Sequence, residues 1–445
     1  MNTHTEFCRQ AGLVVLGYFV HRLGLWADIE QVVHIPQKVH CHSPTAKLLD
    51  AFITILAGGH GLVESNLRVR TEPVVQAAFG RRRCADQSTI STTFNRCTAA
   101  NVAQLRAAVK VILHKHGQCS RHDYAQAWQV LDIDMTGLVA GAQGEGVTKG
   151  YFAQQRHRRG RQLGRVLATR YEELVTERLY EGKRQLEHSF QELVLATENV
   201  LDLSANQRGR TILRVDGGAG DEANIRWVLG RGYHLMTKLH NWNRAKKLAA
   251  SVTQWYPDGK VADRELGWVT QPTAYGQPTR QVAIRHPKVD QRGQRGWHYQ
   301  VLVFTLTDAM LATLSGHALS PQPRPPDVLR AAAQAYDLRD GGLETQNRGD
   351  KQGLGLSHRN KRAFAAQEML VLLAQLAHNV LIWTRHTLIA YDPQFRKFGI
   401  QRLVRDVFQI GGQVTLSADQ HVLSVVLNPD HPYAKAVEHV FLDEM

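Results

Sequence analysis

Two aspartates lie in apolar segments, where a carboxylate needs a specific partner. Asp134 lies inside the run LDIDMT, and Asp216 ends the run ILRVD. Burying a carboxylate among Leu, Ile and Val is costly unless it is paired, hydrogen-bonded or bound to a metal ion. Two Mg²⁺ ions about 3.5–4 Å apart, held by such oxygens, can activate a water or a 3′-OH and stabilise a leaving oxygen. On these two residues alone, a metal site and a pair of ordinary strand-end aspartates both stay open.

A second carboxylate competes with Asp134 on the same strand. Asp132 is two residues earlier, and residues two apart on a strand share a face. Asp132 is therefore either a ligand in place of Asp134 or its close neighbour.

A third acid lies among basic side chains in the segment YDLRDGGLETQNRGDK, residues 336–351. This segment supplies Tyr336, Arg339, Glu344 and Lys351. On a continuous helix, Glu344 and Lys351 fall two turns apart on one face. A carboxylate for a metal beside an Arg and a Lys for phosphate suits phosphoryl transfer. The alternative is the solvated, charged face of an ordinary helix.

Apolar periodicity predicts the elements that would position these residues. Residues 1–125 show helical spacing, and residues 128–240 predict three strands, a helix, a strand, a helix and a strand, which is an α/β pattern. Residues 241–326 alternate like antiparallel strands, and we expect no helices there. We therefore expect a helical domain (1–125), an α/β segment (126–240), a β-rich segment (241–326), a further helical segment (327–395) and a C-terminal hairpin and tail (396–445).

The charge of the chain favours a polyanionic partner. The sequence has 54 Lys and Arg against 40 Asp and Glu, a net charge of +14. Lys and Arg that neutralise phosphates release counterions, so nucleic acid is the expected partner, and an ordinary basic protein is the alternative. The basic loop at residues 154–165 contributes three candidate phosphate contacts: Arg158, Arg159 and Arg161.

The N-terminal region offers a second candidate DNA contact. A short helix ends near residues 79–80, and Asp86 is positioned to cap a helix that runs from about residue 87 to residue 96. Hydroxyl, amide and guanidinium groups can read base edges and phosphates, whereas a plain helical bundle with a basic surface is the alternative. The side chains on one side of this helix are Thr89, Thr92, Asn95 and Arg96.

Cysteine use and hydropathy set the expected compartment. The five cysteines include no C-x-x-C pair, which favours a reducing environment over a disulfide framework. No stretch of 18 apolar residues and no signal peptide are present. We expect a cytoplasmic, nucleoid-associated protein with no membrane partner.

Together these motifs resemble the bacterial insertion-sequence transposases of the DDE class, specifically those with a Tyr-Arg-Glu-Lys signature. DMT at residues 134–136 resembles their first-acid motif, which favours Asp134 over Asp132, and VDGGAGDEANIRWVLGRGYHLMTKL resembles their second. AAQEMLVLLAQLAHNVLIW resembles the helix after their third acid, and QSTISTTFNRC resembles their N-terminal segment. The resemblance implies a ribonuclease-H-like mixed sheet flanked by helices, with an all-β insertion between the second and third acids.

One departure from the signature concerns the third motif. Four residues separate Arg339 from Glu344, where the family has three, and two of them are Gly341 and Gly342. Each glycine costs a helix about 1 kcal/mol relative to Ala, so we expect a break or a bulge there. Asp340 is the fallback third acid.

The resemblance also implies an activity. Asp134, Asp216 and Glu344 would hold two Mg²⁺ ions, for which Mn²⁺ can substitute, while Tyr336, Arg339 and Lys351 would contact phosphates. The expected function is a transposase that binds inverted repeats in double-stranded DNA, cuts a phosphodiester and joins the 3′-OH to target DNA, as a homodimer. The alternatives are a metal-dependent nuclease and a DNA-binding protein that has lost its chemistry.

Overall fold

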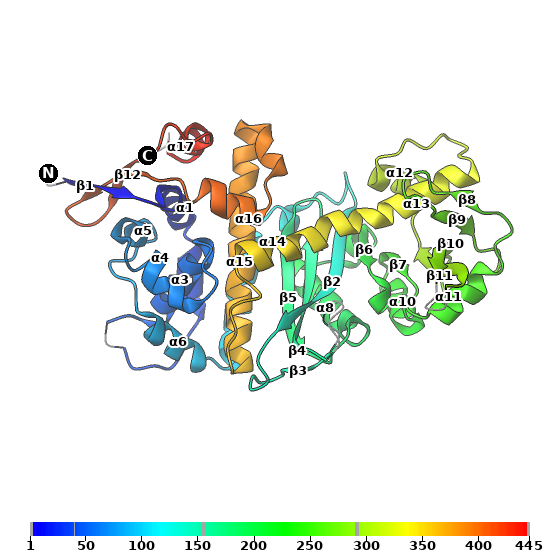
Figure 1. Ribbon diagram of the computed structural model, residues 1–445, viewed down its shortest axis with the longest axis horizontal. Helices are drawn as coiled ribbons and strands as arrows, with labels where there is room; N and C mark the ends of the chain where they lie inside the picture. Colours follow the sequence, from blue (N-terminus) through cyan, green and yellow to red (C-terminus); the bar gives the residue numbers. More distant parts are fainter. Residues whose placement is uncertain (1–2, 40, 151, 153–156, 290–292, 443–445) are drawn as a thin grey trace.

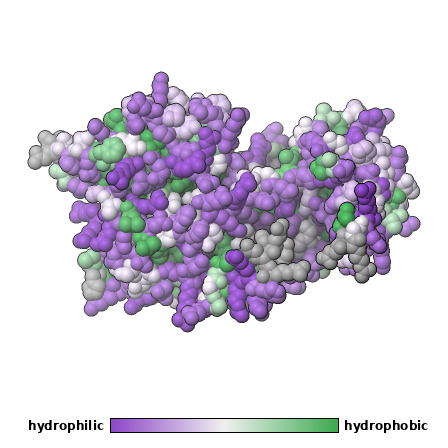
Figure 2. All heavy atoms as spheres, in the orientation of Figure 1, coloured by the Kyte–Doolittle hydropathy of each residue, from purple (hydrophilic) through white to green (hydrophobic). Residues whose placement is uncertain are grey.

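The computed structural model describes residues 3–39, 41–150, 152, 157–289 and 293–442 (Figure 1). A large mixed sheet occupies its centre and extends to one end, and most of the N-terminal helices gather at the other end. The long helix α15 (Phe364–Tyr391) runs between the two parts. The face of the molecule in Figure 2 is mostly hydrophilic, and its apolar side chains are scattered in small patches.

The central sheet has ten strands in the order β3-β4-β2-β6-β7-β11-β10-β9-β8, and β5 pairs with β4 beside this path. Strands β2, β6 and β7 are parallel, whereas β4 is antiparallel to both β2 and β5. The strands are β2 (Gln129–Val139), β3 (Thr148–Lys149), β4 (Arg159–Ala168), β5 (Glu173–Glu181), β6 (Thr211–Val215), β7 (His234–Lys238), β8 (Tyr256–Pro257), β9 (Glu265–Trp268), β10 (Arg280–Val289) and β11 (Arg295–Phe304).

The expected chain order of three strands, helix, strand, helix and strand is present in outline, with α8 (Leu186–Leu201) before β6 and α10 (Glu222–Gly230) before β7. The structure adds the two-residue strand β3 before α8 and the short helix α9 (Ala205–Arg208) after it. The expected loop at residues 154–165 is wrong in part, because β4 already begins at Arg159. The many Arg and Gln residues of this segment are typical of a loop, but several of their side chains are buried in the structure. Residues 154–156 of that segment lie outside the described residues.

The expectation of an insertion without helices is also wrong. Residues 241–326 contain α11 (Trp242–Ala249) and α12 (Asp308–Ser315) in addition to four strands. Those strands extend the central sheet, because β11 pairs with β7 through Leu302↔Lys238. Helix α11 covers one face of the hairpin β10–β11 with Ala245 and Ala249, so its short apolar stripe is buried against the sheet.

The N-terminal region is mostly helical, as expected, but it begins with a strand. Strand β1 (Thr3–Cys8) pairs with β12 (Gly412–Ser417), which forms the expected C-terminal hairpin with β13 (Val422–Leu427). The two ends of the chain therefore share one small sheet. The helices of this region are α1 (Ala11–Arg22), α2 (Leu25–Val32), α3 (Pro44–Leu56), α4 (Ser65–Arg68), α5 (Pro73–Ala78), α6 (Gln87–Asn95) and α7 (Ala99–His116).

Helix α15 is the main core helix. It is long and apolar enough to cross a membrane, but 89% of its most apolar window is buried inside the protein, as a core helix of this kind would be. It packs against α7, α3 and β5 and so joins the N-terminal helices to the sheet.

A second long helical segment crosses the sheet and carries the third motif. It consists of α13 (Pro325–Arg339), the π-helical turn η4 (Asp340–Glu344) and α14 (Thr345–Gly353). Asp327 lies in the first turn of α13 and two prolines start it, both of which suit a helix N-terminus. In Figure 1 this segment lies across β2 and reaches α15.

Candidate catalytic site

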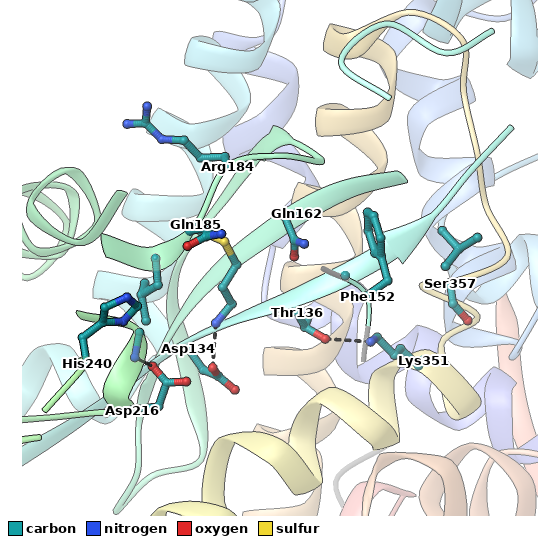
Figure 3. Close-up of a pocket in the computed structure, with 15 residues that line it drawn as sticks. Asp134, Thr136, Phe152, Gln162, Arg184, Gln185, Asp216, His240, Lys351 and Ser357 are labelled. Carbon is teal, nitrogen blue, oxygen red and sulfur yellow. Dashed lines mark hydrogen bonds between the residues drawn. The ribbon is translucent and has the colours of Figure 1, made fainter. Parts of the chain in front are cut away.

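Asp134 and Asp216 come together because their strands are neighbours. Strands β2 and β6 are parallel, with Ile133 opposite Val215, so Asp134, which lies within β2, and Asp216, which directly follows β6, come side by side at the end of β6. Both carboxylates line one cavity of about 700 Å³ (Figure 3). Asp134 accepts a hydrogen bond from the Met135 amide at 2.8 Å, and Asp216 accepts one from the Gly218 amide at 2.7 Å. These bonds fix the carboxylates at the cavity wall.

The carboxyl group of Asp134 is in an environment that disfavours its charge. Burial raises the pKa of Asp134 to about 6, and the nearby charges of Asp216 and Glu344 add to that rise. Arg339 opposes it, with a guanidinium nitrogen 3.9 Å from the Asp134 carboxylate. Like charges held together in a partly buried place favour either a proton or a cation between them. The donor set therefore fits a divalent metal ion.

Glu344 faces this pair from the helical segment but does not complete a closed ligand set. It is exposed, it does not line the cavity, and it acts on Asp134 through its charge. Over the described ranges, no three His, Cys, Asp or Glu side chains lie close enough to hold a metal ion together. The three acids converge on one region, but two of them form the cavity wall and the third stands beside it.

The competing acid on β2 has a different role. Asp132 is fully buried and accepts two hydrogen bonds from Arg214, at 2.6 and 2.9 Å. Arg214 also donates to the Ala335 carbonyl at 2.6 Å, which ties α13 to the sheet. Asp132 is thus committed to an ion pair, whereas Asp134 opens into the cavity. The fallback acid Asp340 is exposed and lies 3.4 Å from Arg339.

The extra residue in the third motif is absorbed by η4. A π-turn bonds residue i to i+5, so Arg339 and Glu344 lie one above the other, as residues four apart do in an α-helix. The expected bulge is confirmed. Gly342 has a steric reason to be glycine, because a Cβ atom there would lie 2.8 Å from an Asp132 carboxylate oxygen.

Tyr336 and Lys351 lie on either side of η4 and point toward the acids. Tyr336 is buried, and the Arg339 guanidinium lies 5.8 Å from its ring centroid. Lys351 lines the cavity and donates to Thr136 Oγ1 at 2.6 Å (Figure 3). Burial lowers the pKa of Lys351, and the charge of Arg165 adds to this effect.

Arg165 is a buried residue that the sequence analysis missed. It stands opposite Asp134 in the pairing of β2 with β4. Its guanidinium binds the carboxylates of Glu177 and Asp350 and donates to Asn347 at 2.6 Å. His378 of α15 lies 2.8 Å from the other Asp350 oxygen. This network fixes the position of α14, and therefore of Lys351, relative to β4.

The predicted DNA-contact helix forms, with the cap that was expected. Asp86 accepts from the Thr89 amide at 2.9 Å and starts α6. Thr92, Asn95 and Arg96 are exposed, whereas Thr89 is half-buried and donates its hydroxyl to Asp86 at 2.7 Å. In Figure 1, α6 lies with the N-terminal helices, on the other side of α15 from β2 and β6.

The three arginines of the basic segment divide into two kinds. Arg158 and Arg159 are exposed. Arg161 is only 1% exposed and donates to the carbonyls of Glu145, Lys361 and Arg362 at 2.7, 3.0 and 3.0 Å. In this structure the Arg161 guanidinium therefore has internal partners, because it ties β4 to Glu145 and to the segment before α15.

Comparison with known proteins places this geometry in a family. A solved piggyBac transposase, from a cryo-EM synaptic complex with hairpin DNA, matches with a TM-score of 0.44 and 11% identity over 91% of this chain and 83% of that chain. No curated protein matches the sequence at a significant level. A family model described as transposase DDE domain group 1 matches residues 5–444. Since that match spans nearly the whole sequence, the chain belongs to this family of DDE transposases.

Proposed function

We propose that this chain is a bacterial insertion-sequence transposase of the Tyr-Arg-Glu-Lys type. It would bind the inverted repeats at transposon ends, hydrolyse a phosphodiester and join the freed 3′-OH to target DNA. The observation that carries this proposal is the shared cavity of Asp134 and Asp216, whose carboxylates come from neighbouring parallel strands. Glu344 raises the pKa of Asp134 from across the site, and Lys351 supplies a cation on the cavity wall.

The topology of the sheet supports the proposal. The strand order β5-β4-β2-β6-β7, with β4 antiparallel and β6 and β7 parallel to β2, is the arrangement that we infer to be ribonuclease-H-like. The first acid then lies on the central strand and the second at the end of its parallel neighbour. The strands β8 to β11 form an insertion that extends this sheet between the second and third acids.

Asp134, Asp216 and Glu344 would hold two Mg²⁺ ions, with Mn²⁺ as a substitute. When bound, the metal ions supply an activated nucleophile and charge stabilisation at the leaving oxygen. Lys351 and Arg339 would bind the phosphate oxygens flanking the bond that is cut, because charge-assisted hydrogen bonds suit these anions. Tyr336 would orient Arg339, since its ring packs against the guanidinium.

The partner is double-stranded DNA, at transposon ends and target, and two copies of the chain would pair two DNA ends. Thr92 and Asn95 of α6 and Arg96 directly after it, with Thr89 behind them, would read one part of the end sequence. Arg158 and Arg159 would bind backbone phosphates. A protein with these partners would work in the cytoplasm, at the nucleoid.

The test is a cleavage and strand-transfer assay on a labelled duplex that carries the flanking inverted repeats. With Mg²⁺, the wild-type protein is expected to nick at the repeat end, and a pre-cleaved end is expected to be joined to a target duplex. Asp134→Ala, Asp216→Ala and Glu344→Ala should each lower the rate by about 10³-fold or more, roughly 4 kcal/mol of barrier, with binding of the duplex retained.

Three outcomes would change the proposal. Cleavage without any joined product would make the chain a nuclease. Binding without cleavage in Mg²⁺ or Mn²⁺ would make it a DNA-binding protein that has lost its chemistry. Full activity of Glu344→Ala would show that another residue is the third metal-binding acid, and Asp340 would be substituted next.

A further inference from the structure

Three basic side chains lie on one face of the sheet beside the catalytic cavity. Lys238 ends β7, directly after Thr237, whose hydroxyl donates to the Asp216 carbonyl at 3.0 Å. His286 and His298 are directly opposite each other on β10 and β11. Lys238 is paired with Leu302, which lies four residues along β11 from His298, so all three residues share one face of the sheet. We call these residues, Lys238, His286 and His298, the basic row.

Lys238 is a half-buried cation that lacks an anion. Its ammonium lies 4.8 Å from the ring centroid of Tyr336, and no described residue forms a hydrogen bond or an ion pair with that ammonium. Burial lowers the pKa of Lys238. The carboxylates that act on it, Asp337 and Asp340, are already committed to Arg264 and Arg339.

The two histidines are in a similar position. Their ring centroids are 4.8 Å apart, and His298 Nδ1 is buried without a hydrogen-bond partner in the described part of the chain. Burial lowers the pKa of both, and the positive charge of Lys238 contributes to the shift at each ring. The three groups therefore place one ammonium and two neutral imidazoles, each of which can donate an N–H, on one face of the sheet. Lys288, which is exposed two residues after His286 on the same face, adds a second ammonium farther out.

Unpaired polar groups of this kind cost free energy, because each has lost water without gaining a partner. An incoming anion with several acceptor oxygens would satisfy the ammonium and the imidazole N–H groups together. We propose that Lys238, His286 and His298 form a phosphate-binding site for the DNA strand next to the bond that is cut. Lys238 directly follows Thr237, whose hydroxyl donates to the Asp216 carbonyl, so the Lys238 end of this site adjoins the segment that carries Asp216.

This inference rests on the proposed function, because the ligand is a phosphodiester of the substrate DNA. A free phosphate ion offers the same chemistry, and the two sources differ in one respect. If the ligand is a DNA phosphate, the site is part of a longer contact with the duplex. Loss of its one cation then lowers the number of counterions released on DNA binding by about one. Free phosphate would occupy the site without changing that dependence.

The experiment measures the dissociation constant of the repeat-end duplex over a range of salt concentrations, without divalent metal. The variants are Lys238→Gln and the double change His286→Gln with His298→Gln, and Lys238→Arg is the charge-retaining variant. Lys246→Gln is the matched control, because Lys246 is an exposed lysine on α11, which covers the opposite face of the same hairpin. Thermal melting confirms that each variant is folded.

Lys238→Gln is expected to weaken binding by about 3- to 10-fold at 0.1 M salt and to reduce the slope of log K against log salt by about 1. The histidine pair is expected to weaken binding by a similar factor, and Lys238→Arg and Lys246→Gln should resemble wild type. Wild-type affinity and slope in Lys238→Gln and in the histidine pair would overturn the inference and leave the proposed function intact. Two results together would assign the site to free phosphate: millimolar inorganic phosphate abolishes binding of the duplex, and Lys238→Gln keeps the wild-type salt slope. No DNA binding by the wild-type chain would overturn both.

Discussion

Two regions of the sheet bury charge in opposite ways, although they share strand β2. Below the cavity, Asp132 is held by Arg214, and Arg165 is held by Glu177 and Asp350. At the cavity, Asp134 lies 3.9 Å from Arg339, no other cation in the described part of the chain lies closer, and its pKa is raised to about 6. The first region is closed, since each charge has its partner. The second is open, since its charges repel one another.

This difference distinguishes charges that support the fold, in the closed region, from charges that can bind a ligand, in the open region. A closed ion pair fixes the position of an element, and breaking it leaves a buried charge. An open group of carboxylates costs stability in the free protein and is retained where a ligand will occupy it. Asp132 and Asp134 are two residues apart, so substitution of each one tests the distinction within a single strand.

The largest expected effect is on stability at the closed pair. Asp132→Ala should lower the free energy of unfolding by about 3–5 kcal/mol, because Arg214 would remain buried without its carboxylate. At pH 7.5, Asp134→Ala should lower it by no more than about 1 kcal/mol, because removal of a disfavoured charge offsets the contacts that are lost. Urea unfolding of both variants measures this. Equal losses of unfolding free energy in the two variants would contradict the distinction between the closed and the open region. The double change Asp132→Leu with Arg214→Met should recover much of the stability that Asp132→Ala loses.

The next effect is a pH dependence at the open group. The folded pKa of Asp134, about 6, lies above its ordinary value of 3.8, so the folded chain binds this proton more tightly than the unfolded chain. The stability from that proton is present below pH 3.8 and is lost as the pH rises through 6. Asp134→Asn should therefore be more stable than wild type by about 2–3 kcal/mol at pH 7.5, and by much less at pH 4.

Thermal melting at both pH values, without divalent metal, checks the sign. A variant that is less stable than wild type at pH 7.5 would contradict the open character of the site. Addition of Mg²⁺ at pH 7.5 should then raise the melting temperature of wild type and leave that of Asp134→Asn nearly unchanged.

The two glycines of η4 provide a matched pair of intermediate effect. A Cβ atom at Gly342 would lie 2.8 Å from the Asp132 carboxylate, whereas one at Gly341 meets nothing within 4 Å. Gly342→Ala should cost about 1–3 kcal/mol of stability and slow cleavage. Gly341→Ala should be neutral or stabilising by up to about 1 kcal/mol. Urea unfolding distinguishes them, and the reverse order would show that the π-turn is not set by contact with Asp132.

The smallest expected effect on stability is at the two exposed arginines, Arg158 and Arg159, with the buried Arg161 as their contrast. Arg158→Ala with Arg159→Ala should change stability by less than about 0.5 kcal/mol and reduce the salt slope of DNA binding by about 2. Arg161→Ala should leave that slope unchanged and cost about 1–3 kcal/mol of stability, because three backbone carbonyls lose the donor that the buried Arg161 side chain supplies. A change of salt slope in Arg161→Ala would show that Arg161 reaches DNA after all.

Much of the local structure was predictable from the sequence. Asp86 caps α6, as its position before a helical run predicted. Gly341 and Gly342 predicted the irregular turn before Glu344. Asp134 and Asp216 were visible because acids are rare inside runs of Leu, Ile and Val. Each of these signals acts over a few residues, which is the range that a sequence pattern describes well.

Long-range partners were not predictable in the same way. The turn of Arg161 into the core depends on carbonyls some 200 residues away, and the pairing of Asp132 with Arg214 depends on the register of β2 against β6. The basic row exists only because β11 pairs with β7 across more than 60 residues. An alternating run such as RGRQLGRV could have suggested that β4 begins at Arg159, because every second residue faces the same side.

The most direct test of the central claim is metal rescue at the three acids. Asp134→Cys, Asp216→Cys and Glu344→Cys should each lose cleavage in Mg²⁺ and regain part of it in Mn²⁺, because a thiolate is a poor ligand for Mg²⁺ and a better one for Mn²⁺. Asp340→Cys, at an exposed acid beside Glu344, should keep wild-type activity in both metals. Rescue at all three positions is the predicted result, whereas normal Mg²⁺-dependent cleavage by any of these three variants would show that its carboxylate does not hold the metal.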